Sequence, residues 1–371
     1  MDFKKSLVLI LCMVFLLSQV SACSATPREY DFIELPNEEI LTLEEDAPIK
    51  ALYTSSTYKL PKESTDDDVI FYAEQDKKAY YTRHEIAPRS NSAKKAEIGY
   101  LENETDKANT LVSSTGSKHS WYNELNLLED KLVFVNHLKD KYQVESIPAN
   151  GGNIKVIAKL KNPVSLSVID GLIYVYELKG DKALIKSINP STQEEKVVTD
   201  NVYLISPNER ISWEDSNHSA WFEKIDGQIF LFYKDKSEMK KIRLDKYAVC
   251  FLSYHDNYLT WMELPEETSW HNEKIHVYNT KTEEHKLLKL PEAGNFVSVN
   301  GKIYLIITKS EDNKESCKLY EWDLASDQIR AIHSIEAAQN IVSFPKVYGN
   351  GNILINYEKD DQFCADFLSS K

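Results

Sequence analysis

The side chains with the widest chemical repertoire in this chain are nine histidines and five cysteines. A metal-binding or catalytic histidine usually has a second histidine, a cysteine or a carboxylate at short, regular spacing. Here the histidines are dispersed, and only His271 and His276 approach such spacing, on opposite sides of an expected turn. We therefore interpret the histidines as surface or core residues and expect no metal site and no cofactor.

Short motifs that indicate catalysis are also missing. The sequence contains no G-x-S-x-G, no H-E-x-x-H, no P-loop and no Rossmann glycine pattern. Two acidic runs, Asp66-Asp67-Asp68 and Glu311-Asp312-Asn313, offer oxygen ligands of the kind calcium prefers, but neither has EF-hand spacing. Solvated turns are the better interpretation of both runs.

One cysteine lies at the end of a targeting segment. Lys4 and Lys5 precede an unbroken apolar run from Leu7 to Leu17, which is the layout of a secretory signal peptide. A run of 11 residues is about half as long as the roughly 20 helical residues that a bilayer core requires. We therefore expect export rather than a retained transmembrane helix.

Val20-Ser21-Ala22-Cys23 follows this run and resembles the lipobox of bacterial lipoproteins. The resemblance implies that residues 1–22 are cleaved and that the Cys23 thiol carries acyl chains of the palmitate kind. The chain would then be anchored on the extracytoplasmic face of the cell membrane, and two acyl chains suffice for stable anchoring. Val20 and Ala22 also suit ordinary signal peptidase, which would give a freely secreted protein.

Charge and composition limit the partners. The precursor has a formal charge of −14, and residues 1–22 contribute two Lys and one Asp, so the mature chain is near −14 − (+1) = −15. This charge argues against nucleic acid and against a polybasic membrane contact. Residues 23–48 are polar and acidic and are interpreted as a tether, although Tyr30 to Leu35 is also compatible with a strand docked on the body.

The other cysteines do not form a disulfide framework. Cys12 leaves with the signal peptide, which leaves Cys250, Cys317 and Cys364. Cys317 and Cys364 are the first candidates for a single bridge, because both fall in equivalent strands of neighbouring repeats. Buried free thiols are the alternative.

A repeated turn followed by an apolar strand dominates residues 49–371. The repeat occurs at Glu129–Phe134, Asp170–Val175, Asn208–Trp213, Asp256–Trp261, Asn300–Leu305 and Asn350–Ile355. Between Leu132, Leu172, Ile211, Tyr258, Lys302 and Ile353 the steps are 40, 39, 47, 44 and 51 residues. One four-stranded propeller blade takes about 40 to 50 residues. An all-β propeller is therefore predicted, with an array of β-sandwiches as the structural alternative.

These repeats, and second strands such as Leu319 to Leu324, resemble bacterial β-propellers. The likeness is to the propeller of TolB and to YWTD-like propellers of uncharacterised exported lipoproteins. The six repeats and one further unit before Trp121 predict seven blades, with six and eight also compatible. Val69–Ala73 and Lys78–Ile86 are expected to be middle strands of a first blade, with an edge strand and a polar insertion in Ala87–Ser120. An N-terminal strand is expected to close the last blade.

Two longer segments are candidates for a binding surface. Glu214 to Lys224 and Glu263 to Asn272 are interpreted as loops that carry Trp221, Trp270 and His271. If both loops lie on one propeller face, these three residues would rim a site for a glycan or a peptide, because exposed tryptophan is an efficient binding residue. The alternative is that each tryptophan packs on its own blade.

Two functions remain open. The anchor, the propeller and the missing motifs favour a non-catalytic binding or protein-interaction module at the outer face of the membrane. The alternative is a glycosidase or lyase acting on cell-envelope polysaccharide. Carboxylates from different blades would then line the central funnel and leave no local sequence motif.

Overall fold

The structure is a computed structural model. It describes residues 32–44, 47–64, 66–86, 93–102, 107–115, 121–138, 141–180, 182–203, 218–235, 238–244, 249–263, 273–291, 294–311, 314–341, 345–348 and 352–371. Within these ranges no helix is long and apolar enough to cross a membrane.

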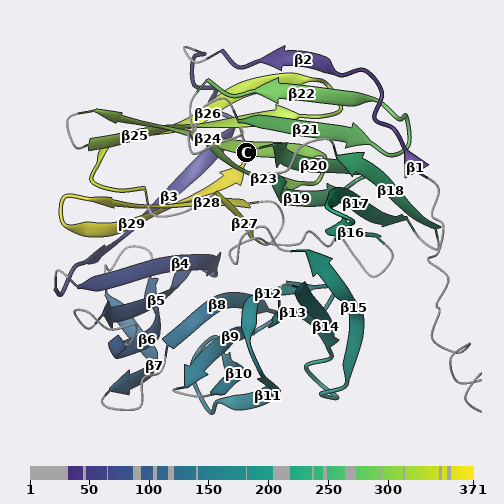
Figure 1. Cartoon of the computed structure of the whole chain (residues 1–371). Coiled ribbons are helices and arrows are strands. Elements are labelled where there is room, and N and C mark those ends of the chain that lie inside the picture. The colour runs from purple at the N-terminus through teal and green to yellow at the C-terminus, as the bar shows by residue number, and fades with distance from the viewer. Residues whose placement is uncertain are drawn as a thin grey trace, which may run out of the picture.

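Seven sheets surround the centre of the molecule (Figure 1). Within each sheet, the first of the strands that follow one another in the chain is innermost. This arrangement confirms the seven-bladed all-β propeller. Blades 1 to 3 contain β4 (Asp67–Gln75), β5 (Lys78–Ile86), β6 (Ala93–Glu102) and β7 (Ala108–Thr115); β8 (Trp121–Leu128), β9 (Lys131–Leu138), β10 (Lys141–Pro148) and β11 (Lys155–Leu160); and β12 (Pro163–Ile169), β13 (Leu172–Lys179), β14 (Lys182–Ile188) and β15 (Glu195–Tyr203).

Blades 4 to 7 each follow the same inside-to-outside order. They contain β16 (His218–Ile225), β17 (Gln228–Asp235), β18 (Glu238–Leu244) and β1 (Phe32–Ile33); β19 (Val249–His255), β20 (Tyr258–Glu263), β21 (Lys274–Asn279), β22 (His285–Lys289) and β2 (Glu39–Thr42); β23 (Gly294–Val299), β24 (Lys302–Glu311), β25 (Lys314–Asp323) and β26 (Gln328–Ala338); and β27 (Lys346–Tyr348), β28 (Asn352–Lys359), β29 (Gln362–Ser370) and β3 (Tyr53–Pro61).

Tight two-residue turns join the first two strands of most blades. Asp170 and Gly171 have φ of 51° and 74°, and Asn300 and Gly301 have φ of 51° and 66°. Two successive positive φ angles define the hairpin turn that matches the twist of the strands, and Asx-Gly adopts it readily. The repeated sequence signature is therefore this turn followed by the second strand.

The hydrophobic core is divided among the interfaces between blades. Each of the seven buried clusters contains residues from two neighbouring sheets. Between blades 4 and 5, for example, Leu231 and Tyr233 pack with Leu259 and Trp261. A blade alone would expose both apolar faces, so the faces are buried only when the blades stack in a ring.

The ring is closed by the N-terminal strand β3. It pairs antiparallel with β29 over nine residue pairs, from Tyr53↔Ser370 to Pro61↔Gln362. The last blade therefore combines three strands from the C-terminal end with one from the N-terminal part of the chain, and the predicted closure is confirmed.

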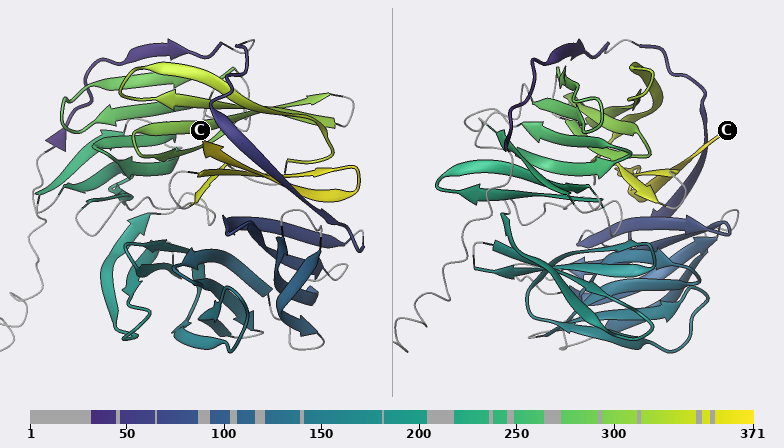
Figure 2. Two further views of the ribbon diagram at one scale, coloured as in Figure 1. Left: turned by 180° about the vertical axis from the view of Figure 1, so that it is seen from behind. Right: turned by 90° about the vertical axis from the view of Figure 1, so that its right-hand side faces the viewer.

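Residues 32–42, here called the strap, lie along the outer edge of two blades. Phe32–Ile33 pairs parallel with β18 of blade 4, and Glu39–Thr42 pairs parallel with β22 of blade 5. Both views in Figure 2 show the strap, in purple, against the outermost green strands. The stretch that composition assigned to a tether thus contains docked strands, including one within Tyr30 to Leu35.

Three details of the sequence analysis are corrected. β4 is the innermost strand of blade 1 rather than a middle one. Ala87–Ser120 holds two strands, β6 and β7, rather than one edge strand with an insertion. The second strand of blade 4 is β17, which follows the turn at Asp226 and Gly227, whereas the signature at Asn208–Trp213 lies outside the described residues.

Cys317 and Cys364 are free and buried. They lie on β25 and β29 and share the cluster between blades 6 and 7. Burial raises the pKa of Cys317 to about 12 and that of Cys364 to about 11. The alternative of buried free thiols therefore holds, and the candidate bridge is not present; the side chain of Cys250 is not among those described.

Candidate functional site

The end of the propeller where the innermost strands begin is here called the entry face. It is defined by Asp67, Trp121, Pro163, His218, Val249, Gly294 and Lys346, the first residues of these strands. Because strands alternate in direction within a blade, the connections after the second strand and between blades also lie at this end. Tyr203, the last residue of β15, and Glu263, the last residue of β20, therefore lie at this end.

The structure corrects the assignment of Glu214 to Lys224 as a loop. His218–Ile225 is β16, so Trp221 lies within the innermost strand of blade 4 and is 7% exposed. Its ring stacks on Phe232 of the same blade at 6.0 Å, and its Nε1 donates to Glu223 Oε1 at 2.8 Å. Trp270 and His271 lie outside the described residues, as does Cys23.

A cluster of imidazole and aromatic rings lies on the entry face between blades 1 and 2. His84, near the end of β5, is 2% exposed and stacks on Trp121 with ring centroids 4.5 Å apart. Its Nε2 accepts a hydrogen bond from the Tyr122 N–H at 3.1 Å, so the proton of the neutral ring is on Nδ1. Burial lowers the pKa of His84 to about 4, and the ring is therefore uncharged at neutral pH.

A second histidine completes this cluster. His137 is paired with Trp121 across β8 and β9, and its ring lies edge-on to Tyr142 at 4.8 Å. Burial lowers the pKa of His137, while the charge of Glu124 opposes the shift. Glu124 has φ of 53° within a register shift of β8, and such bulges redirect side chains next to binding sites.

This arrangement suits a neutral, polar ligand. Two half-buried rings, Trp121 and Tyr142, offer apolar faces, and the half-buried imidazole of His137 offers a directional donor and acceptor. The buried His84 ring supports Trp121 from behind. The pair was not predicted from the sequence, but one signal of it exists there. His84 and His137 each lie six residues after the first residue of the second strand of their blade, Lys78 and Lys131.

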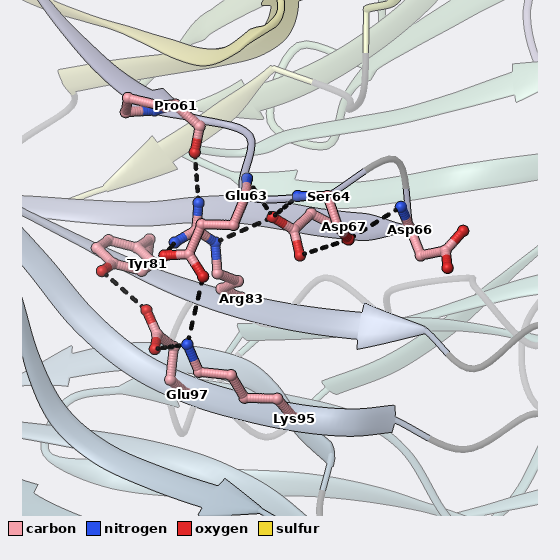
Figure 3. A network of polar contacts seen from close by, with 9 residues as sticks. All are labelled: Pro61, Glu63, Ser64, Asp66, Asp67, Tyr81, Arg83, Lys95 and Glu97. Atoms are coloured by element: carbon pink, nitrogen blue, oxygen red, sulfur yellow. Dashed lines mark hydrogen bonds and ion pairs between the residues drawn. The ribbon is translucent and has the colours of Figure 1, made fainter.

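A polar network occupies the neighbouring joint, between blades 7 and 1 (Figure 3). Arg83 is 3% exposed; its Nη1 donates to Glu63 Oε1 at 2.6 Å and its Nη2 to the Pro61 carbonyl at 2.5 Å. The Nε of Arg83 lies 3.7 Å from Asp67 Oδ2, an ion pair without a hydrogen bond. Lys95 pairs with both Glu63 and Glu97 at 3.4 Å.

The contacts of Asp67 explain the first acidic run. Its Oδ2 accepts the backbone N–H groups of Glu63 and Ser64 at 2.7 and 3.1 Å. This carboxylate therefore folds the connection from β3 to β4 rather than facing solvent. Asp312 and Asn313 of the second acidic run lie outside the described residues.

Two carboxyl groups from different blades interact on the same face. Burial, together with the charge of Glu358 on β28, raises the pKa of Asp68 at the start of β4. Glu358 is paired with Lys62 at 2.6 Å. Asp68 is also directly opposite His84 across β4 and β5, so their side chains share one face of the sheet.

Comparisons with known proteins show the fold and no family. No protein-family model and no curated protein sequence matches the chain. The solved structure of an oligogalacturonate lyase in complex with manganese has a TM-score of 0.55 at 11% identity, covering 86% of this chain and 96% of that chain.

Two further propellers extend the comparison. The propeller domain of the Trilobed protease from Pyrococcus furiosus, described as having an open velcro topology, has a TM-score of 0.53 at 11% identity over 82% of this chain and 94% of that chain. TolB from Acinetobacter baumannii has a TM-score of 0.43 at 12% identity over 73% and 80%. The likeness is one of fold.

Proposed function

We propose that this chain is a lipid-anchored, extracytoplasmic propeller that binds a neutral polar ligand, such as a cell-envelope glycan, without catalysis. The stacked pair Trp121 and His84 carries the proposal, because it presents a half-buried indole face on a rigid, uncharged support. Sugar rings and apolar side chains pack on such faces. The mature charge near −15 adds no basic surface for a nucleic acid.

Binding arrays of glycans and peptides test the ligand site. We expect Trp121→Ala to lose the ligand that the full chain binds, and Phe230→Ala to keep it, because Phe230 is a half-buried ring on blade 4 under Lys241. Selective binding of peptides instead of glycans would change the ligand class. Equal binding by both variants would reject the site.

The anchor is proposed from Lys4, Lys5, the Leu7–Leu17 run and Cys23. The docked strap adds a distance limit. From Cys23 to the first docked residue, Phe32, are 32 − 23 = 9 residue steps, which span at most about 32 Å. The body would therefore lie close to the membrane. Cys23→Ser should release the protein into the medium, and continued membrane retention of that variant would reject lipidation.

A second candidate is a glycosidase or lyase, and the pair Asp68 and Glu358 favours it. A carboxyl group whose pKa is raised by burial, with a second carboxyl group from another blade nearby, is the arrangement that acid–base cleavage of a glycosidic bond needs. We would expect wild-type protein to release products from envelope polysaccharide and Asp68→Asn to release none. The exposed Asp130→Asn variant is the control. No turnover by the wild-type protein would reject this candidate.

A further inference from the structure

Two histidines and a carboxylate meet at the outer edge of blade 5. His276 is on β21, His285 is on β22, and Glu38 belongs to the strap just before β2. One ligand atom of each lies within 4.8 Å of the others. The group belongs to blade 5, not to the cluster between blades 1 and 2, so it is independent of the proposed ligand site.

The two imidazoles face each other with a nitrogen from each. His276 Nδ1 and His285 Nε2 are 3.0 Å apart, and the ring planes differ by only 14°. Both rings are buried, and the Trp261 indole lies parallel to them, at 8° to His276 and 12° to His285. The packing therefore fixes the direction in which these nitrogens point.

The outer nitrogen of each ring has an acceptor as its partner. His276 Nε2 lies 3.1 Å from Glu263 Oε2, and His285 Nδ1 lies 3.3 Å from the Pro36 carbonyl. Each neutral imidazole has one proton, and a proton on each outer nitrogen would satisfy both acceptors.

With one proton on each outer nitrogen, no proton is left for the contact between the two inner nitrogens. With both outer protons in place, His276 Nδ1 and His285 Nε2 each direct a lone pair at the other across 3.0 Å. Two lone pairs at this separation repel unless a cation lies between or beside them. A metal ion, or one extra proton, would remove this repulsion.

The surroundings match those of a metal ion. Histidine ligands of metals almost always donate their other N–H to a carboxylate or a backbone carbonyl, which fixes the tautomer. Glu263 serves His276 in this way, and Pro36 serves His285. Tetrahedral ligands at 2.0–2.1 Å are about 3.3 Å apart, which is close to the 3.0 Å between these two nitrogens.

We propose that Glu38, His276 and His285 form a binding site for a divalent transition metal of the zinc class. Two imidazoles and one carboxylate are ligands that zinc favours, and the fourth position is left to solvent. Glu38 comes from the strap and both histidines from blade 5. The metal therefore fastens the strap to the blade.

The test is a metal titration of the full chain, purified in detergent and stripped with a chelator. Zn²⁺ in competition with a chromophoric chelator should bind with one equivalent, and Co²⁺ should give the visible absorption of a tetrahedral site. Glu38→Gln should weaken binding by at least about tenfold, the low end of what loss of an outer partner alone costs. Glu38 is exposed, so this variant keeps the fold.

Matched variants make the result decisive. Glu39→Gln changes the neighbouring exposed carboxylate and should bind as wild type. His285→Gln should abolish binding, and Glu263→Gln, a positioning variant, should weaken it about 10- to 100-fold. Zn²⁺ should also protect the wild-type strap, but not the His285→Gln strap, from cleavage by a glutamate-specific protease.

Two results would overturn the proposal. The first is the absence of stoichiometric Zn²⁺ or Co²⁺ binding, which would leave an extra proton as the cation. The second is stoichiometric binding that Glu38→Gln and His285→Gln leave unchanged, which would place the metal elsewhere.

Discussion

Arg83 of blade 1 holds Glu63 at 2.6 Å across the joint where the ring of blades closes. Glu63 belongs to the connection that follows β3, the N-terminal strand of the last blade, and leads into β4 of the first. The guanidinium also donates a hydrogen bond to the carbonyl of Pro61, the last residue of β3. One buried side chain therefore links the two sheets that close the ring.

Arg83→Met should destabilise the protein strongly. It removes the partner of Asp67, whose side chain is 3% exposed, and breaking such a pair from one side costs about 3–5 kcal/mol. Glu63→Gln should cost about 1 kcal/mol or less, because the Glu63 side chain is 58% exposed. Free energies of unfolding from denaturant titration test this order, and equal losses would contradict it.

Removal of β3 should open the ring, whereas removal of the strap should not. A chain truncated to residues 62–371 loses the outer strand of blade 7 and the buried Tyr58 and Leu60, and it exposes the edge of β29. We expect a lower unfolding temperature and aggregation, because an unpaired edge strand templates association.

A chain without residues 23–47 retains β3 and provides the control for this truncation. It should remain monomeric in size-exclusion chromatography. If both truncated chains behave alike, β3 is not what closes the ring.

Cys317 and Cys364 should resist modification in the native protein. Their raised pKa values, about 12 and about 11, leave little thiolate at pH 8, and both side chains are buried. A chromogenic thiol reagent should label both only as fast as the protein unfolds. Rapid labelling of either residue in the Cys317→Ala or Cys364→Ala variant, without denaturant, would contradict this.

Stability should fall in mild acid because of His84. Its folded pKa of about 4 lies below the unfolded value of about 6.5, so the unfolded chain takes up a proton that the folded chain does not. The contribution of neutral His84 to the free energy of unfolding is complete above about pH 6.5. It is lost as the pH falls toward 4, and the limiting loss is about 3 kcal/mol. Unfolding midpoints at pH 7 and pH 4.5 measure it.

His84→Asn is the comparison, since its side-chain oxygen can still accept a hydrogen bond from a backbone N–H such as that of Tyr122. The variant should lose less stability than wild type between these two pH values. His255, whose pKa burial also lowers to about 4, gives both proteins the same residual loss. An identical pH dependence in the two proteins would exclude His84 as the source.

Local pattern determined the fold. Asx-Gly turns such as Asn300-Gly301, each followed by an apolar strand, encode hairpins through φ preference and alternation, and these signals are short-range. Repetition at blade length then required radial stacking, because each sheet has two apolar faces. The same local reading failed at Trp221, since a polar segment next to a strand gives no sign of where the strand begins.

The sequence by itself predicted a propeller of six to eight blades closed by an N-terminal strand, and it predicted an export signal with a lipid-accepting cysteine. Only the tertiary structure decided which side chains meet. His84 joins Trp121 across two blades, and Glu38 joins His285 across 285 − 38 = 247 positions. Such pairs depend on strand register and on where the strap docks, and no local spacing records either of them.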